Sequence, residues 1–357
     1  MKKNLLVLFG GKSSEHDVSV LSARNVLQHI NREDYNVYII GITKQGRWLY
    51  VTREEELETG EWIYGDKNAY LLPDATKQSV AVMSDDREQK ESFIRVDVCF
   101  PVLHGKNGED GTVQGLLDLS GIPYVGCGVL SSATAMDKLT TKILVKELGI
   151  RQAKHVSILP HELVSPERVQ EKILATLDYP VFVKPANAGS SVGVSKARND
   201  AELATAIGAA AVEDRRILVE EAIVGREIEC AVFSDGVTRS LGVGEVVAAN
   251  EFYDFEAKYH NAASKTVVDP VLPAGVEDAV KRAAERIFDA LDCYSLSRVD
   301  FFLEEGTNEI VFNEINTMPG FTAISMYAML ARKAGLSNRE LIAALIDSAF
   351  KRGRYGA

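Results

Sequence analysis

The sequence has few cysteines and no cysteine motif. Its 357 residues contain four cysteines, and no two of them form a CxxC pair. All four are scattered among apolar or small residues, a setting typical of buried free thiols rather than of metal ligands or disulfides. This pattern suits a reducing compartment. These residues are Cys99, Cys127, Cys230 and Cys293.

Long apolar runs and an excess of basic residues are also missing. The first apolar run, residues 5–9, is short and lacks a small-residue cleavage site, so it predicts a strand and not a signal peptide. Nothing approaches the roughly 18 apolar residues that a membrane span needs. With 40 Lys and Arg against 51 Asp and Glu, the net charge is −11 and no basic stripe stands out. We therefore expect a soluble, cytoplasmic protein that binds neither nucleic acid nor a membrane surface.

The common nucleotide-binding fingerprints are absent. The segment GGKSS, residues 10–14, is similar to the end of a Walker A loop. That motif requires a glycine five residues before Gly11, however, and Leu6 stands there. No GxGxxG follows an expected strand either. A nucleotide site must therefore be sought in other residues.

The order of the expected elements predicts an α/β protein of two or three domains. A strand in NLLVLFGG, a helix in SVLSARNVLQHI and a strand in YNVYIIGIT form a βαβ opening, which VDVCFPVLHG and IPYVGC extend. We expect domains over residues 1–133, 134–223 and 224–357. A new helix is expected over residues 131–150, and another from Pro166 with Ser165 as its N-cap. The stretch 247–265 is too long for a simple hairpin and predicts an active-site lid.

Two lysines and a loop of small residues suggest a phosphate site. Lys184 lies in the apolar strand VFVKPA, immediately before the loop NAGSSVG, and Lys138 begins a helix. A buried, unpaired ammonium is costly, so Lys184 either faces the surface or has a partner. Glycine and serine residues let backbone N–H groups and hydroxyls approach phosphate oxygens closely, beside a balancing cation.

Two acidic segments offer oxygen ligands. In ILVEEAIVGRE, Glu220 and Glu221 form either a solvated strand end or acceptors for the amine and hydroxyls of a nucleotide. In RVDFF and FNEIN, a hairpin would bring Asp300 close to Glu314, with Asn316 on the same face. The set is either a polar hairpin face or a site for Mg²⁺ or Mn²⁺, and the flanking apolar residues argue against full exposure.

Taken together, these segments resemble the D-alanine–D-alanine ligase family of the ATP-grasp superfamily. The likeness runs in order through FGGKSSEHDVSV, VLHGKNGEDGTVQGLLDLSGIPYVGC, MDKLTTK, VKPANAGSSVGVSK, LVEEAIVGREIEC, FYDFEAKY, RVDFF, FNEINTMPGFT and SMY, and covers nearly the whole chain. It implies an ATP-grasp fold with an N-terminal Rossmann-like domain. It also implies ATP as co-substrate, two Mg²⁺ or Mn²⁺ ions, a homodimer, and a role in peptidoglycan precursor synthesis.

The resemblance also implies a role for individual residues. ATP would be bound by Lys138, Lys184, Ser191, Glu220, Glu221, Ile223 and Glu227. The metal ligands would be Asp300, Glu314 and Asn316. Arg298 and the backbone N–H of Gly320 would support the developing oxyanion. Glu15 would hold the ammonium of the first D-alanine and form a lid-locking set with Ser190 and Tyr259. The remaining substrate contacts would come from His104, Lys258, Ser325 and Met326.

For two of these positions, the residues alone are equally compatible with a purely structural role. Glu15 could simply be an acidic residue in a first helical turn, where it favours the helix dipole, and a lone histidine such as His104 is more often structural. For the second substrate, relatives that make D-alanyl-D-lactate commonly replace the lid tyrosine, so Tyr259 favours D-alanine. Met326 favours the same choice. Phe255 stands where many family members have a second tyrosine, and this difference bears on the choice of the second substrate. The alternatives are a D-alanine–D-lactate or D-alanine–D-serine ligase, and a non-catalytic nucleotide-binding regulator, which would be expected to lose Arg298 or a metal ligand.

Overall fold

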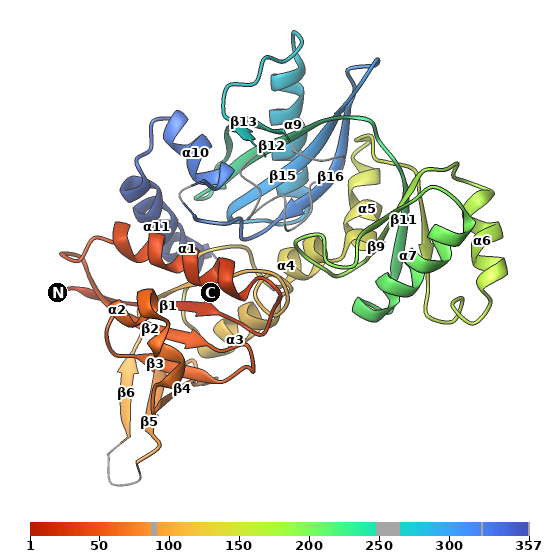
Figure 1. The fold of residues 1–357 in the computed structure, drawn as a ribbon. Coiled ribbons are helices and arrows are strands. Elements are labelled where there is room, and N and C mark those ends of the chain that lie inside the picture. Colours follow the sequence, from red (N-terminus) through yellow and green to blue (C-terminus); the bar gives the residue numbers. More distant parts are fainter. Residues whose placement is uncertain (87–90, 248–264, 323, 356–357) are drawn as a thin grey trace.

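The structure is a computed structural model that describes residues 1–86, 91–247, 265–322 and 324–355. Three separate β-sheets follow one another along the chain, each with its own helices (Figure 1). The stretch 247–265, expected to be a lid, lies almost entirely outside the described residues.

The first sheet has seven strands in the order β6-β5-β4-β3-β2-β1-β7. Its parallel part pairs β1 with β2 and β7, and residues 5–9 of β1 are fully buried, as a strand covered on both faces requires. The βαβ opening is therefore confirmed. The strands are β1 (Lys3–Gly10), β2 (Tyr35–Ile42), β3 (Trp48–Val51), β4 (Lys67–Leu71), β5 (Ser79–Ser84), β6 (Ser92–Arg95) and β7 (Val98–Leu103). The helices are α1 (His16–His29), α2 (Glu55–Thr59), the 3₁₀ helix η1 (Glu61–Tyr64) and α3 (Thr112–Ser120).

Two expectations in this region need correction. IPYVGC was expected to extend the sheet, but it contributes only an isolated parallel bridge between Tyr124 and Cys99. The expected helix over residues 131–150 is two helices, α4 (Val129–Met136) and α5 (Lys138–Glu147). Asp137 separates them because its backbone is extended and its side chain accepts the N–H of Thr140, which caps α5.

The second sheet has four strands in the order β10-β9-β11-β8. Helix α6 (Pro166–Leu174) begins at Pro166 as predicted, but the Ser165 side chain makes no capping hydrogen bond. Helix α7 (Asp200–Glu213) is capped by Asn199, whose side chain accepts the N–H of Glu202. The strands are β8 (His155–Ile158), β9 (Val181–Pro185), β10 (Ser195–Ala197) and β11 (Ile217–Glu221).

The third sheet has five strands in the order β14-β13-β12-β15-β16. The predicted hairpin is confirmed, because β15 and β16 are antiparallel neighbours with Asp300 directly opposite Glu314. The strands are β12 (Gly225–Ser234), β13 (Thr238–Val247), β14 (Lys265–Val267), β15 (Ser295–Glu304) and β16 (Ile310–Asn316). The helices that follow or cover them are α9 (Val276–Ala290), α10 (Met326–Lys333) and α11 (Asn338–Tyr355).

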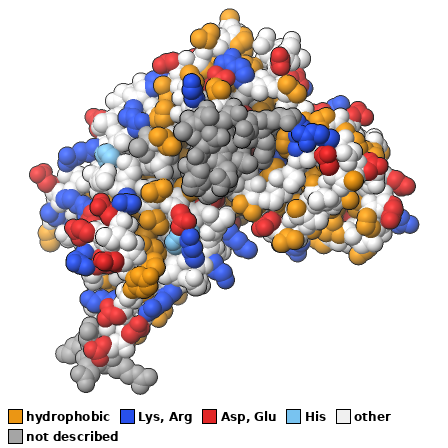
Figure 2. Space-filling model, in the orientation of Figure 1, with side chains coloured by type: hydrophobic (Ala, Val, Ile, Leu, Met, Phe, Trp, Pro, Cys, Tyr) orange, Lys and Arg blue, Asp and Glu red, His pale blue; other side chains and the backbone are white. Residues whose placement is uncertain are grey.

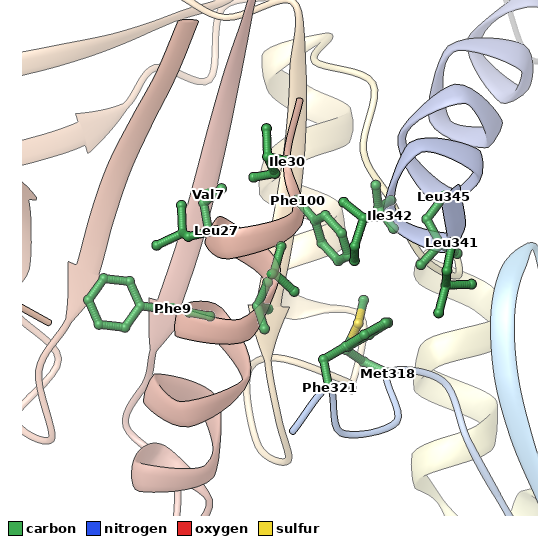
Figure 3. Packing of buried hydrophobic residues seen from close by; sticks show 14 of the residues in the cluster. Val7, Phe9, Leu27, Ile30, Phe100, Met318, Phe321, Leu341, Ile342 and Leu345 are labelled. Carbon is green, nitrogen blue, oxygen red and sulfur yellow. The ribbon is translucent and has the colours of Figure 1, made fainter. Parts of the chain in front are cut away.

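One hydrophobic core joins the first sheet to the end of the chain. Figure 3 shows Phe9 and Phe100 from the first sheet in the same cluster as Met318 and Phe321, which follow β16. The ring of Phe321 meets that of Phe100 edge-on, with centroids 5.8 Å apart. Leu345 of α11 belongs to the same cluster. The loop after β16 is therefore packed against the first sheet, although it belongs to the third sheet by sequence.

The surface and the cysteines agree with the sequence. Figure 2 shows basic and acidic side chains interspersed over one face of the molecule. In the described part of the chain, no helix has both the length and the apolar character to cross a membrane. All four cysteines are free and buried, as expected.

Candidate active site

The serine loop between β9 and β10 has an uncommon backbone. Ser190 and Ser191 have positive φ angles of 48° and 58°, and Gly193 has one of 71°. Left-handed backbone in two adjacent non-glycine residues is disfavoured and tends to occur at functional sites. Consecutive turns of this kind also group backbone N–H donors on a concave face, which suits an anion. The loop thus has the backbone chemistry that its composition predicted.

The tip of this loop touches the start of α1, which follows the first strand of the first sheet. Ser190 Oγ donates to Glu15 Oε1 at 2.5 Å, a contact between residues 175 positions apart. Glu15 stands at the start of α1 and is 8% exposed. Gly189 and Gly105 lie against the same carboxylate, since a Cβ built on either would come within 2.4 Å of Glu15 Oε2. Both glycines therefore let the backbone close around this one carboxylate.

The two predicted lysines lie at the base of the loop. Lys138 donates its backbone N–H to Ala186 and its Nζ to the carbonyl of Ala188, at 3.0 and 2.7 Å. The Lys138 Nζ is also 3.6 Å from Glu314 Oε2. On β9, Lys184 Nζ lies 3.5 Å from the side-chain oxygen of Asn313 on β16. Both ammonium groups therefore lie between the serine loop and the acidic hairpin.

A buried charge network supports Lys184, and sequence reasoning missed one of its members. Glu220, 4% exposed, forms ion pairs with Lys142 of α5 and, at 2.7 Å, with Lys184. Burial alone would raise the pKa of Glu220, but the two ammonium groups outweigh it and lower the pKa to about 2. Lys142 follows Lys138 by four residues, so both lie on one face of α5, and this spacing was the available signal.

The other predicted nucleotide residues lie near β11 and β12. Glu221 Oε1 accepts the backbone N–H of Lys154 at 2.8 Å. Ile223 is partly exposed in the connection to β12, which carries Glu227. Burial, with the charges of Glu229 and other nearby carboxylates, raises the pKa of Glu227 to about 7 although Lys184 opposes the shift.

The predicted metal ligands and the predicted oxyanion residue Arg298 lie side by side on β15 and β16. Arg298 makes a bidentate contact with Asp300, at 2.8 and 2.7 Å, and its Nε is 3.2 Å from Glu229 Oε2. The side-chain amide of Asn316 donates to Asp300 Oδ2 at 2.9 Å. Burial would lower the pKa of Arg298, but Asp300 and Glu229 raise it above its usual range. Glu229 was missed, although it follows Glu227 by two residues and so shares its face.

The donor set fits a divalent cation in its chemistry. Asp300 and Glu314 supply carboxylate oxygens, and Asn316 supplies an amide, which are the hard ligands that Mg²⁺ and Mn²⁺ prefer. Glu227 and Glu229 add further negative charge close by, which a cation would offset. Within the described residues, however, no group of three or more acidic, histidine or cysteine side chains is arranged around one ion position. Arg298 holds the Asp300 carboxylate instead, so metal binding would require the two to share it.

The predicted residues after β16 are brought together in one turn. Ser325 precedes α10, and its Oγ accepts the N–H of Thr322 at 2.9 Å. A Cβ on Gly320 would lie 3.0 Å from that same Oγ, so the two predicted residues are neighbours. Met326 is 3% exposed and packs on β13, where a Cβ on Gly244 would come within 2.3 Å of its sulfur. The Met326 side chain is therefore part of the hydrophobic core. The group that Met326 presents at the start of α10 is its backbone N–H.

His104 connects two parts of the chain. Its Nδ1 lies 2.9 Å from the carbonyl of Met318, and its Nε2 lies 2.9 Å from Ser22 Oγ on α1. Because a carbonyl oxygen only accepts hydrogen bonds, Nδ1 of His104 must be the donor to Met318. Nε2 then forms the hydrogen bond with the Ser22 hydroxyl. The backbone carbonyl of His104 accepts from Ser13 Oγ. The predicted substrate residue Lys258, the predicted lid residue Tyr259 and also Phe255 lie outside the described residues.

Comparison with known proteins identifies the family. The family model "D-ala D-ala ligase C-terminus" matches residues 144–347, and "D-ala D-ala ligase N-terminus" matches residues 4–127. The chain belongs to the D-alanine–D-alanine ligase family. The D-alanine–D-alanine ligase of Acetivibrio thermocellus is 46% identical, over 98% of this chain and 96% of that protein. The enzyme of the same name from Caldicellulosiruptor bescii is 45% identical, over 99% and 96%.

Solved structures of family members have the same fold. The VanG D-Ala:D-Ser ligase from Enterococcus faecalis superimposes with a TM-score of 0.88 at 37% identity, covering 98% of this chain and all of that one. The D-alanine–D-alanine ligase from Coxiella burnetii gives a TM-score of 0.86 at 31% identity, covering 99% and 95%. The expected α/β ATP-grasp fold is therefore confirmed.

Proposed function

We propose that this enzyme joins two D-alanines into D-alanyl-D-alanine, for peptidoglycan precursor synthesis, at the expense of ATP. The proposal rests on family membership over nearly the whole chain and on the site's chemistry. The observation that carries it is the contact of Ser190 with Glu15, because it closes the serine loop onto a carboxylate of the first domain. A cytoplasmic location and a homodimer are part of the proposal by family likeness.

The chemistry requires activation of a carboxylate. A free carboxylate is a poor acyl donor because its leaving group would be oxide. Transfer of the γ-phosphoryl group of ATP to the first D-alanine gives D-alanyl phosphate and ADP. The amine of the second D-alanine then attacks the carbonyl carbon, and phosphate leaves from a tetrahedral intermediate. Such phosphoryl transfer depends mainly on positioning and charge neutralisation.

The nucleotide side of the proposed site is built from the loop and its lysines. Lys138 and Lys184 lie beside the serine loop and would neutralise phosphate charge, while the Ser191 N–H and hydroxyl would bind phosphate oxygens. Glu227, with a pKa of about 7, could donate to or accept from ribose hydroxyls. The proposed adenine and ribose site continues through three residues of this region: Glu220, Glu221 and Ile223.

The main contribution of Glu220 to this site is to position the two lysines. Both ammonium partners in the structure, Lys142 and Lys184, are held by its carboxylate. Its side chain would therefore keep Lys184 in place for phosphate. This refines the role that family likeness implies for Glu220.

Metal would bind at the acidic hairpin. The proposed ligands are Asp300, Glu314 and Asn316, all presented by the hairpin of β15 and β16. Bound there, Mg²⁺ or Mn²⁺ would neutralise phosphate charge during transfer. Lys138, 3.6 Å from Glu314, keeps this carboxylate next to the phosphate loop before nucleotide binds.

The acyl-transfer side would be formed by Arg298 and Gly320. Arg298 is buried and kept charged by Asp300 and Glu229, so it can offset an oxyanion on the tetrahedral intermediate. The backbone N–H of Gly320 would be the second donor. On the substrate side, Glu15 would bind the ammonium of the first D-alanine, with His104 near its carboxylate. Exclusion of water would protect the acylphosphate, for which Lys258 and Tyr259 are the proposed lid residues.

The second substrate would sit at the start of α10. A helix N-terminus favours a carboxylate, and Ser325 adds a hydroxyl to the Met326 N–H. A D-alanine–D-serine ligase is the second candidate, because the VanG D-Ala:D-Ser ligase matches over 98% of this chain. By family likeness, Tyr259 favours D-alanine over D-lactate or D-serine, whereas Met326 contributes through its backbone N–H because its side chain is buried.

A product assay tests the proposal. The enzyme is incubated with ATP, Mg²⁺ and D-alanine, alone and with D-serine or D-lactate, and products are identified by mass. D-alanyl-D-alanine as the main product supports the proposal. A dominant D-alanyl-D-serine or D-alanyl-D-lactate product would contradict the second-substrate assignment only. The absence of ADP with every D-amino acid would contradict the ligase function itself.

A further inference from the structure

Glu109 connects two loops that the proposed reaction uses at different steps. Its Oε2 accepts the backbone N–H of Gly105 at 2.8 Å, and its Oε1 accepts the backbone N–H of Met318 at 2.8 Å. Gly105 belongs to the loop that packs on Glu15, where the first D-alanine is proposed to bind. Met318 begins the turn that carries Gly320. One carboxylate thus spans two segments that are 213 positions apart in their numbering (318 − 105).

The turn around Gly320 is also held on its other side. Asn25 of α1 donates its side-chain amide to the carbonyl of Phe321 at 2.5 Å, and Ser22 Oγ accepts the N–H of Phe321 at 3.1 Å. The side chains of Met318 and Phe321 are buried in the core that faces the first sheet (Figure 3). Gly320 therefore lies in a short segment between Met318 and Phe321, both of which are held in place.

These contacts fix the direction of a backbone donor. A carboxylate has two acceptor oxygens, and each oxygen of Glu109 accepts a backbone N–H group. Charged hydrogen bonds of this kind are shorter and stronger than neutral ones. An oxyanion donor must lie within a few tenths of an ångström of its working position, because the stabilisation falls off with distance. Glu109 holds one end of the turn, and Asn25 and Ser22 hold the other. These three residues lie outside the third sheet, and together they fix the position of the turn.

We propose that Glu109 is a positioning residue that holds the Gly320 N–H in place for the amine-attack step. It acts through Met318 and the turn, and it touches neither the substrate nor the nucleotide in this role. The inference rests on the proposed function, since it assumes that Gly320 stabilises the tetrahedral intermediate. It predicts that loss of Glu109 slows acyl transfer more than it slows phosphoryl transfer.

The test compares two neutralised carboxylates in one loop. Glu109→Gln keeps the shape but offers one acceptor, so one backbone N–H would face an amide NH₂. Asp110→Asn is the matched control, because Asp110 accepts the backbone N–H groups of Asn107 and Thr112, both within its own turn. Rapid-quench single turnovers with ATP, Mg²⁺ and D-alanine measure ADP and dipeptide separately.

The expected result is a split between the two steps. For Glu109→Gln, dipeptide formation falls about 10- to 100-fold while ADP formation stays within about threefold of wild type, because one displaced oxyanion donor costs up to a few hundredfold. Asp110→Asn leaves both rates close to those of wild type. Equal slowing of both steps, or wild-type rates for both, would overturn the inference.

A second variant covers the case in which Glu109→Gln does not fold. Asn25→Ala removes the anchor on the Phe321 side, and we expect the same split with a smaller loss of dipeptide formation. Unchanged dipeptide formation in Asn25→Ala would then overturn the inference. If wild type itself forms no dipeptide, the proposed function fails. If wild type is active and the variants match it, only the role of Glu109 fails.

Discussion

The buried network of Lys142, Glu220 and Lys184 supports a quantitative prediction for Glu220→Gln. The two lysines lower the pKa of Glu220 from 4.5 to about 2. At 1.36 kcal/mol per unit, this shift corresponds to about 3 kcal/mol in favour of the folded, ionised state. Glutamine keeps the shape but leaves two buried ammonium groups without their carboxylate. We therefore expect a loss of about 3 to 5 kcal/mol in the free energy of unfolding at neutral pH.

The stabilisation contributed by ionised Glu220 should depend on pH in a defined direction. Because the folded pKa is below the unfolded value, this stabilisation is present above pH 4.5 and is lost as the pH falls toward 2. The difference between wild type and Glu220→Gln should therefore shrink to about half or less near pH 3. Urea denaturation at several pH values measures it, with the exposed Glu167→Gln as control, for which we expect a change within about 0.5 kcal/mol.

Two results would refute this reasoning. One is a Glu220→Gln variant as stable as wild type at neutral pH, and the other is a deficit that does not depend on pH. The double variant Lys142→Met with Glu220→Gln should recover part of the loss, since one of the stranded ammonium groups is then gone. A double variant that is less stable than Glu220→Gln alone would also contradict the network.

Three further predictions concern activity. Gly189→Ala places a Cβ 2.4 Å from Glu15 Oε2, closer than van der Waals contact allows, so we expect kcat/KM for D-alanine to fall at least about tenfold with little change in ATP affinity. An unchanged value in steady-state assays would show that the loop adapts. Glu229→Gln weakens the hold on Arg298, and we expect kcat to fall about 5- to 50-fold while the KM for ATP stays the same; a change confined to KM would contradict this role. Removal of divalent metal with a chelator should stop ADP formation, and excess Mg²⁺ or Mn²⁺ should restore it; ADP formation that persists without metal would remove Asp300 from the proposed ligand set.

The hairpin shows what a sequence alone can predict. Alternating residues and a glycine turn were enough to place Asp300 opposite Glu314, because strand register follows from the period of two and the turn. The contact of Arg298 with Asp300 follows from the same rule, since the two residues are separated by one position. Local rules therefore carried the metal candidates, whereas the oxyanion role of Arg298 came only from the family resemblance.

Other parts of the site depend on contacts between distant elements. Lys142 on α5 forms an ion pair with Glu220 on β11, and no local pattern in the sequence shows that these two residues come together. Glu109 gained its second partner, Met318, from the opposite end of the chain. The single helix expected over residues 131–150 did not allow for Asp137, whose side chain caps α5 and whose extended backbone ends α4. Tertiary packing decides each of these cases.

Activation of the first D-alanine by phosphorylation is the central claim, and an isotope experiment tests it most directly. D-alanine labelled with ¹⁸O in its carboxylate is incubated with ATP and Mg²⁺, and the released phosphate is analysed by mass. If D-alanyl phosphate forms, one carboxylate oxygen leaves with the phosphate, so the account predicts ¹⁸O in phosphate for each dipeptide made. Dipeptide formation with unlabelled phosphate would contradict it.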